Sequence, residues 1–389
     1  MAGIEYITAG ESHGRMLVGI IKNMPAGLTV DKAFVDGELA RRMLGFGRGG
    51  RMKIERDAAD IVAGVRAHKS IGSPIAVLIE NKDHKNWNET MGADATDAGN
   101  ADKRVTAVRP GHADITGAVK YGFDDARNVL ERASARETAI KVALGAIAKL
   151  YLRELGIEVQ SHTVAIGGVN ADGVTDGSFA NINARADADP VRCLDAQKSA
   201  EMTELIRGAA ANGDTLGGVA EIVVTGCKAG IGSYVSADRK LDGLIMREVG
   251  CVQSVKAVGI GLGAAAAAKL GSAVHDCIYT ADGGAYYRKT NRAGGIEGGM
   301  TNGEPIIVRA YCKPIPTLKR GLDTVDILTG KAAKAASERS DVCAVAAAGV
   351  VCEAAVALAL AAAVSDMLGG DTVDEVKKRY ADKVTRHAE

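Results

Sequence analysis

The feature that most constrains this chain is a long apolar run, Val342 to Val364, whose only charged residue is Glu353. A run of this length is long enough to cross a membrane as a helix. Alanine is its commonest residue, however, and a charge near the middle of a membrane span is costly. The run therefore predicts a buried helix of a soluble protein, with no membrane partner.

A second helix is predicted directly after Ser134. Ser134 and Glu137 stand three positions apart just before an apolar run, which is the capping-box pattern for a helix start. Apolar residues then recur at steps of three and four, as one helix face requires: Ile140, Leu144, Ile147, Tyr151 and Leu155.

The start of this second helix is a candidate anion site, because Arg132 and Arg136 flank it. A helix start carries a partial positive charge, and guanidinium groups suit phosphate and carboxylate oxygens. The stretch alone leaves another interpretation open, in which both arginines are solvated and pair with Glu131 and Glu137.

The charge balance gives no general attraction to polyanions. Among 389 residues, 48 are basic and 48 acidic, so the formal net charge is zero. Such a balance exerts no overall pull toward nucleic acid or a membrane surface, and an anion site therefore requires a local concentration of arginine. With only 4% aromatic residues, the core must be packed from alanine and aliphatic side chains.

The seven cysteines indicate neither disulfides nor a metal site, because their number is odd and no Cys-x-x-Cys occurs. Reduced thiols are typical of a cytoplasmic protein. The first residues, Met1 to Glu5, also lack the basic and apolar regions of a signal peptide. We therefore expect a cytoplasmic protein without a metal.

His13 lies in a short polar loop, Gly10 to Gly14, between predicted strands at Ile4–Thr8 and Met16–Ile21. A turn between rigid strands is a common setting for a functional residue. A single histidine in a turn is also commonly just solvated, so the loop alone does not establish a site. A helix is predicted next, at residues 31–43, with an aspartate near its cap.

A glycine-rich basic loop follows, from Leu44 to Arg56. Its glycines let the backbone approach a ligand closely. Basic residues stand in it or beside it: Arg41, Arg42, Arg48, Arg51, Lys53 and Arg56. Similar loops bind RNA where aromatic side chains stack on bases, but only Phe46 can stack here, and the spacing is not that of a P-loop. A small phosphorylated ligand is favoured.

Two further stretches combine glycine, proline and charge. Gly294 to Gly303 leads into a predicted strand, Pro305–Tyr311, and then into Lys313 to Thr317. The lysine and threonine of that segment are able to hold a phosphate oxygen, or the segment is a rigid surface turn. Arg339-Ser340-Asp341 precedes the long apolar run, with Asp341 as the predicted N-cap.

Strands and helices do not alternate regularly, and no break in composition divides the chain. Other strands are predicted at Ile61–Val65, Ile75–Ile79, Val159–Ile166, Val219–Val224 and Val255–Gly263, and other helices at Asp238–Val249 and Asp371–His387. The pattern favours an α+β fold, with antiparallel or mixed sheets packed on long helices. We expect a single domain over residues 1–389.

Together these stretches resemble the chorismate synthase family. The matching segments occur in family order between residues 10 and 341: Gly10–Gly14, Gly45–Arg51, Arg109–Asp114, Arg132–Thr138, Gly294–Gly303, Lys313–Thr317 and Arg339–Asp341. The chain departs from the usual family pattern at Val342 and Ala133, where the family usually has proline and serine. Ala67-His68 stands where the family often has His-Gly, so His68 receives no role.

The resemblance implies a carbon–oxygen lyase that eliminates phosphate, in a trans-1,4 sense, from 5-enolpyruvylshikimate 3-phosphate to give chorismate. It implies reduced FMN as cofactor without net redox change, and NADPH as a reductant. It also implies a homotetramer of subunits with a β-α-β sandwich fold, in which long central helices lie between sheets. A phosphate and two carboxylates on the substrate agree with the local arginines, and histidine suits proton transfer near neutral pH.

The resemblance also assigns roles to residues. His13 matches the histidine that protonates the leaving phosphate, His112 the histidine beside flavin N1, and Asp341 the carboxylate near flavin N5. Substrate-binding positions match Arg48, Arg109, Ser134, Arg136 and Arg339. FMN-binding positions match Arg132, Ala133, Ser134, Gln253, Ser254, Gly298, Lys313, Pro314, Ile315, Pro316, Thr317 and Arg339, and NADP-binding positions match Arg42 and Arg48.

Two other functions compete with this interpretation. An NADPH-dependent flavin reductase would use the same arginines for the dinucleotide phosphate and would need no shikimate ester. A non-enzymatic RNA-binding protein would use the basic loop, but it would be expected to interleave aromatic residues with the basic ones.

Overall fold

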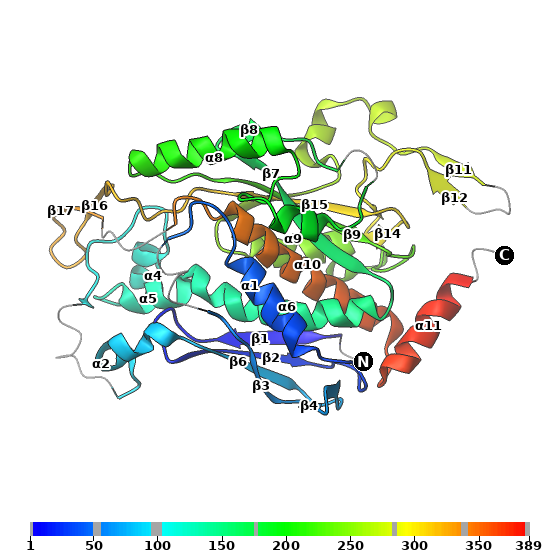
Figure 1. Cartoon of the computed structure of the whole chain (residues 1–389), viewed down its shortest axis with the longest axis horizontal. Coiled ribbons are helices and arrows are strands. Elements are labelled where there is room, and N and C mark those ends of the chain that lie inside the picture. The colour runs from blue at the N-terminus through cyan, green and yellow to red at the C-terminus, as the bar shows by residue number, and fades with distance from the viewer. Residues whose placement is uncertain are drawn as a thin grey trace.

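The chain is arranged in three layers (Figure 1). A computed structural model describes residues 3–49, 56–94, 103–174, 178–281, 286–335 and 341–385. The lower sheet has the antiparallel order β1-β2-β6-β3, built from β1 (Glu5–Ala9), β2 (Met16–Lys22), β3 (Asp60–Ala63) and β6 (Ile75–Glu80). The upper sheet has the antiparallel order β10-β15-β9-β7-β8, built from β7 (Glu158–Ile166), β8 (Val169–Asn170), β9 (Gly218–Thr225), β10 (Val255–Ile260) and β15 (Ile306–Cys312).

The middle layer consists of α1 (Lys32–Arg42), α6 (Thr138–Arg153) and α10 (Val345–Leu368). Helix α6 packs on β2 and β6 of the lower sheet, α10 packs on β7 and β9 of the upper sheet, and the two helices pack on each other. Helix α8 (Ala196–Ala211) lies on the outer side of the upper sheet (Figure 1). The predicted α+β class is therefore confirmed, with antiparallel pairing in both sheets.

The other elements are short or peripheral. The helices among them are α2 (Asn88–Met91), α4 (Asp114–Tyr121), α5 (Arg127–Ala133), α7 (Ile182–Asp187), α9 (Leu241–Gly250) and α11 (Val373–Thr385), with a 3₁₀ turn, η2, at Lys82–Asn86. The strands form four two-stranded ribbons: β4 (Val65–Arg66) with β5 (Lys69–Ser70), β11 (Ile278–Thr280) with β12 (Tyr286–Arg288), β13 (Ile296–Glu297) with β14 (Met300–Thr301), and β16 (Asp323–Val325) with β17 (Ala332–Lys334).

Helix α10 is the apolar run that the sequence predicts to be a buried helix. It is long and apolar enough to cross a membrane, but 94% of its most apolar window is buried inside the protein, as in a core helix. Small residues allow it to approach α6 closely, because a Cβ on Gly145 would lie only 2.3 Å from the Cβ of Ala354. The alanine-rich composition is thus what lets two helices fit between two sheets.

One predicted helix cap is confirmed, because Asp31 accepts a hydrogen bond from the backbone N–H of Ala33 (2.9 Å) at the start of α1. The other two predicted caps are wrong in detail. Helix α10 begins at Val345, and Asp341 instead accepts a hydrogen bond from the backbone N–H of Gly49 (2.6 Å). Helix α6 begins at Thr138, after a 3₁₀ turn at 135–137 that Ser134 caps by accepting from the N–H of Arg136 (3.2 Å).

The carboxylate of Glu137 does not complete a capping box, because it is engaged elsewhere. It accepts hydrogen bonds from the Thr8 hydroxyl of β1 (2.7 Å) and from the Gln253 amide (3.3 Å). The predicted apolar face of α6 is confirmed, since Ile140, Leu144, Ile147 and Tyr151 are all buried. Lys141 and Lys149 are buried as well, because α6 has packed neighbours on both sides.

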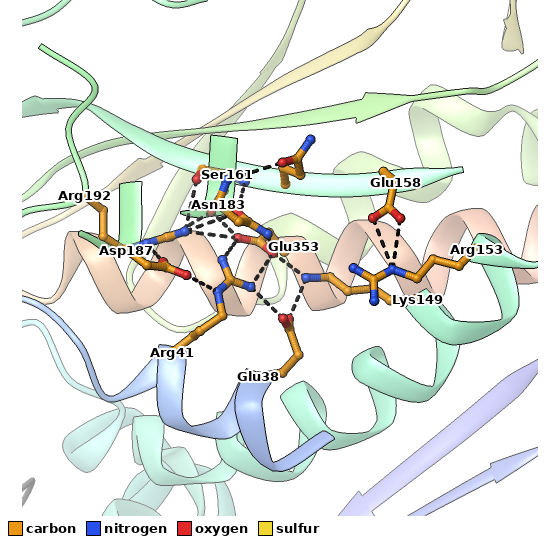
Figure 2. Close-up of polar contacts among 11 residues, drawn as sticks. Glu38, Arg41, Lys149, Arg153, Glu158, Ser161, Asn183, Asp187, Arg192 and Glu353 are labelled. Carbon is orange, nitrogen blue, oxygen red and sulfur yellow. Dashed lines mark hydrogen bonds and ion pairs between the residues drawn. The ribbon is translucent and has the colours of Figure 1, made fainter. Parts of the chain in front are cut away.

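Glu353, the only charged residue between Val342 and Val364, is fully buried and surrounded by cations (Figure 2). Arg41 of α1 donates two hydrogen bonds to its carboxylate (2.9 and 3.0 Å), and Lys149 of α6 donates another. Ser161 of β7 (2.5 Å), Asn183 of α7 (3.2 Å) and Arg192 (3.5 Å) also bind this carboxylate. Although burial alone would raise it, Arg41 and Lys149 hold the pKa of Glu353 far below its usual value.

The cluster extends to two more carboxylates, which balance its cations. Arg41 also binds Glu38 (2.7 Å) and Asp187 (2.6 Å), and Asp187 pairs with Arg192 (2.8 Å). The cluster therefore joins α1, α6, α7, α10 and β7 at one point of the middle layer (Figure 2).

We predict that Glu353→Gln destabilises the fold by about 3–5 kcal/mol, because it leaves buried cations without their shared anion. A matched control is Glu158→Gln, which removes an exposed ion pair with Arg153 (3.1 Å) and should cost only about 0–1 kcal/mol. Urea unfolding of both variants measures the difference. Equal losses of unfolding free energy in the two variants would contradict the role of Glu353 as the anion that the buried cations share.

The same cluster predicts a pH dependence. The pKa of Glu353 is lowered on folding, so its contribution is present above the unfolded value, about 4.3, and is lost as the pH falls toward the folded value. The stability gap between wild type and Glu353→Gln should therefore be constant near neutrality and narrow below about pH 4. Urea unfolding repeated at several pH values checks this, and a gap that widens on acidification would contradict it.

Candidate active site

One cavity of about 780 Å³ collects most of the residues that the sequence singles out. Its walls come from segments far apart in the chain, including the loop after β1, the end of α1, the turn η2, the residues before α4 and α6, and the start of α10. The predicted residues that line it are His13, Arg42, Arg48, Arg109, His112, Ala133, Ser134, Arg136, Gln253, Ser254, Lys313, Ile315, Pro316, Thr317 and Asp341.

Three of the predicted residues that the structure describes are not brought to this cavity. Arg132 is exposed and donates hydrogen bonds to the carbonyl groups of Thr8 and Gly10 (both 3.0 Å), so it fastens the end of β1. Pro314 and Gly298 do not line the cavity, and Gly298 lies in the turn between β13 and β14. Arg339 lies outside the described residues.

His13 is held by a buried carboxylate. Glu131 of α5 accepts from the backbone N–H of His13 (2.7 Å) and lies 2.8 Å from its Nδ1. Although burial opposes it, hydrogen bonds from His13 and Arg127 lower the pKa of Glu131, which keeps this carboxylate ionised. Nδ1 of His13 therefore carries the proton that binds Glu131, and Nε2 is the ring nitrogen left for chemistry in the cavity.

His112 has the same type of support. Its Nδ1 lies 2.5 Å from the buried Asp114, and the Arg109 guanidinium binds both oxygens of that carboxylate (2.9 and 3.0 Å). Against the effect of burial, His112 and Arg109 hold the pKa of Asp114 well below its usual range. Arg109 also donates to the Thr317 hydroxyl (3.2 Å), which ties the segment after β15 to this histidine.

Arg136 is buried rather than solvated. Its guanidinium binds both oxygens of Asp57 (2.6 and 2.8 Å) and the side-chain carbonyl of Asn81 (2.8 Å). The interpretation that it pairs with Glu131 or Glu137 at the surface is therefore wrong, because the 3₁₀ turn before α6 turns it inward.

Arg42 lies beside the ion pair of Arg136 and Asp57, where arginine side chains outnumber carboxylates. It donates to the Thr138 hydroxyl (3.0 Å) and the Ala135 carbonyl (2.9 Å), and its Nη1 lies 3.6 Å from Asp57. Burial lowers its pKa to about 10, with the Arg48 and Arg136 guanidinium groups adding to the effect and Asp57 opposing it. Arg42 thus remains charged at neutral pH in a region that favours a further anion.

The cavity as a whole is cationic. Among the described lining residues, five are basic and two are acidic: Arg42, Arg48, Arg109, Arg136 and Lys313, against Asp83 and Asp341. Arg48 pairs with Asp341 (3.0 Å). Fixed cations and two histidines whose Nδ1 atoms are held by carboxylates suit the binding of an anion and the transfer of a proton to one of its oxygens.

Sequence reasoning missed the groups that hold these side chains. Asp114 ends the motif Arg109–Asp114, and Glu131 directly precedes the motif Arg132–Thr138, so an acidic residue in or beside each motif was an available signal. Asp57 and Asn81 lie 79 and 55 positions from Arg136, and no local pattern could pair them with it. Trp87, whose ring stacks on His13, carried no signal except being the only tryptophan.

Comparisons with known proteins agree on one family. The family model described as chorismate synthase matches residues 4–365. A chorismate synthase of Alkaliphilus metalliredigens (strain QYMF) is 50% identical over 374 residues, covering 96% of this chain and 97% of that protein. One of Geobacillus sp. (strain WCH70) is 48% identical over 386 residues, covering 99% of each. A crystal structure of a chorismate synthase aligns with a TM-score of 0.79 at 37% identity, covering 99% of this chain and 98% of that one.

We predict that inorganic phosphate stabilises this protein against heat, because only the folded state presents the cationic cavity. A concentration of about 100 Kd would add about 2.7 kcal/mol. Arg48→Gln should weaken phosphate binding by about 1.5–3 kcal/mol, the scale of a charge-assisted hydrogen bond.

The measurement is the melting temperature in phosphate and in chloride at equal ionic strength. Arg207→Gln, which removes an exposed arginine of α8, serves as the charge-matched control and should keep the full phosphate effect. If phosphate raised the melting temperatures of Arg48→Gln and Arg207→Gln equally, the phosphate would bind outside this cavity.

Proposed function

Because the chain belongs to the chorismate synthase family, we propose that it eliminates phosphate from 5-enolpyruvylshikimate 3-phosphate in a trans-1,4 sense to give chorismate. It would do so as a carbon–oxygen lyase of the shikimate pathway that uses reduced FMN. The observation that carries the proposal is the pair of carboxylate-supported histidines in one cationic cavity.

The elimination breaks the bond between a ring carbon and the phosphate oxygen, removes a proton from the ring carbon across the double bond, and forms a second double bond. We assign the proton that neutralises the leaving phosphate to Nε2 of His13. Glu131 supports this role, because an ionised carboxylate at Nδ1 stabilises the imidazolium that must exist before the transfer.

Substrate binding is proposed for Arg48, Arg109, Ser134 and Arg136, together with Arg339. Ionic partners that are already in place support it, because a guanidinium fixed by Asp57, Asp114 or Asp341 loses little conformational freedom when it binds an anion. Such cations can neutralise the phosphate and the two carboxylates of the ester.

The residues of the cavity fit a flavin. Apolar side chains that suit a flat ring system line it, namely Leu216, Val252, Ile315, Val345 and Val351, and so do polar groups that suit ring heteroatoms and a phosphate, namely Gln253, Ser254, Lys313 and Thr317. Reduced FMN, when bound, supplies a transient source of electrons without net redox change. His112 and Asp341 are the groups proposed beside it, and Arg42 and Arg48 the groups proposed for NADPH.

We also propose a single-domain, cytoplasmic homotetramer with the β-α-β sandwich of the family. One core cluster that runs from Ile4 to Tyr380 supports a single domain, and seven cysteines without a disulfide support a reducing compartment. The outer face of the lower sheet exposes Ile7 (67%), Val62 (52%) and Ile20 (36%), and such an apolar face supports association with other copies.

The experiment that tests this function is an anaerobic assay with dithionite-reduced FMN and the shikimate ester, in which phosphate release is followed. We predict that His13→Ala and His112→Ala each fold but lose roughly 10²–10⁴-fold in kcat, the range for a positioned acid or base. KM should change little if the lost contact belongs to the transition state.

His275→Ala, which removes an exposed histidine away from the cavity, is the control and should keep full activity. Full activity in both cavity variants would contradict the roles of the two histidines. NADPH oxidation with FMN alone, without phosphate release from the ester, would support a flavin reductase instead.

A further inference from the structure

Trp87 is the only tryptophan of the chain, and its ring stacks on a candidate catalytic histidine. The centroids of the Trp87 and His13 rings are 4.0 Å apart, and the ring planes are 21° from parallel. Both residues line the cavity. Two flat rings at this distance and angle cover each other, so the indole shields one face of the imidazole from water.

The turn that carries Trp87 is tied to the loop that carries His13. At its root, the Asn81 amide donates to the carbonyl groups of Glu11 (3.0 Å) and Gly14 (2.7 Å). Further along, Nδ1 of His84 lies 2.9 Å from the carbonyl oxygen of His13. The stack therefore does not depend on ring–ring attraction alone, because the backbones of both segments are held in register.

Trp87 is itself fixed from several sides. Its indole N–H donates to Asp83 (3.3 Å), while Lys103 and Arg127 lie over its ring at 4.2 and 5.0 Å from the centroid. Arg127 also binds Glu131 (3.1 Å), the carboxylate that holds His13. The contacts thus close a ring from Trp87 through Arg127 and Glu131 to His13.

We propose that Trp87 is a positioning residue for proton transfer at His13. Glu131 fixes one edge of the imidazole at Nδ1, but a single hydrogen bond leaves the ring free to swing about it. The indole face removes that freedom, and the two contacts together aim Nε2 into the cavity.

The stack can be tested without any reaction, because tryptophan emission of this chain reports on Trp87 alone. Because the indole lies against the His13 ring, removing that ring should change the environment and therefore the emission of Trp87. We expect His13→Gln to shift the intensity or the wavelength of the emission, and His275→Gln, a replacement away from the cavity, to leave both unchanged. Emission of His13→Gln that is identical to that of the wild type would overturn the proposal.

The kinetic consequence rests on the proposed function and uses the phosphate-release assay. Trp87→Leu should lower kcat by about 10–100-fold, the order expected when a reacting group is misplaced by about 1 Å, while KM stays within about threefold. Trp87→Phe, which can still stack, should restore kcat to within about threefold. Phe123→Leu, an aromatic replacement outside the cavity, should have no effect on either constant.

These measurements distinguish a failure of the positioning role of Trp87 from a failure of the proposed function. Loss of activity in His13→Gln without loss in Trp87→Leu would overturn the positioning role and leave the proposed function standing. Full activity in His13→Gln would instead contradict the role of His13 in the reaction. Equal losses in Trp87→Leu and Trp87→Phe would show that stacking is not what matters, and would also overturn the positioning role.

Discussion

The buried carboxylate of Glu353 is the constraint on which the rest of this fold depends. A buried carboxylate in the middle of an alanine-rich helix is stable only if cations pair with it. Arg41 of α1 and Lys149 of α6 provide these ion pairs. The ion pairs therefore fix the positions of α1, α6 and α10 relative to one another, because Glu353 is paired in only one arrangement. Arg42, the next residue after Arg41, then lies at the wall of the cavity, as does the first part of α10. The ionic cluster thus sets both the packing of the core and the position of the site.

The same physical device is repeated around the cavity. Glu131 holds His13, Asp114 holds His112 and Arg109, Asp57 holds Arg136, and Asp341 pairs with Arg48. Each carboxylate binds a histidine or an arginine that lines the cavity, so these histidines and arginines are oriented before a ligand binds. Pre-arranged charges of this kind cost little reorganisation during a reaction. The basic residues still outnumber the acidic ones along the wall, which leaves the cavity suited to an anion.

A feature could be predicted from the sequence when the interactions that determine it join residues close together in the chain. Periodicity and composition are local, so the burial of α10, the apolar face of α6 and the antiparallel strands were accessible. The Asp31 cap of α1 was accessible for the same reason. The caps of α6 and α10 were not, because Glu137 and Asp341 bind Thr8 and Gly49, which are more than a hundred positions distant. The resemblance to a family located most of the cavity wall. It could not reveal the carboxylates behind that wall, since their pairing depends on the folded chain.

The central claim is that the site is assembled before substrate binds, and the most direct test is a crystal structure of the complex with reduced FMN and the shikimate ester. We predict that the leaving phosphate oxygen lies within about 2.6–3.2 Å of Nε2 of His13, while Nδ1 of His13 remains on Glu131 and Arg136 remains on Asp57. A phosphate bound beyond the reach of His13, or a His13 ring turned away from Glu131 in the complex, would contradict it.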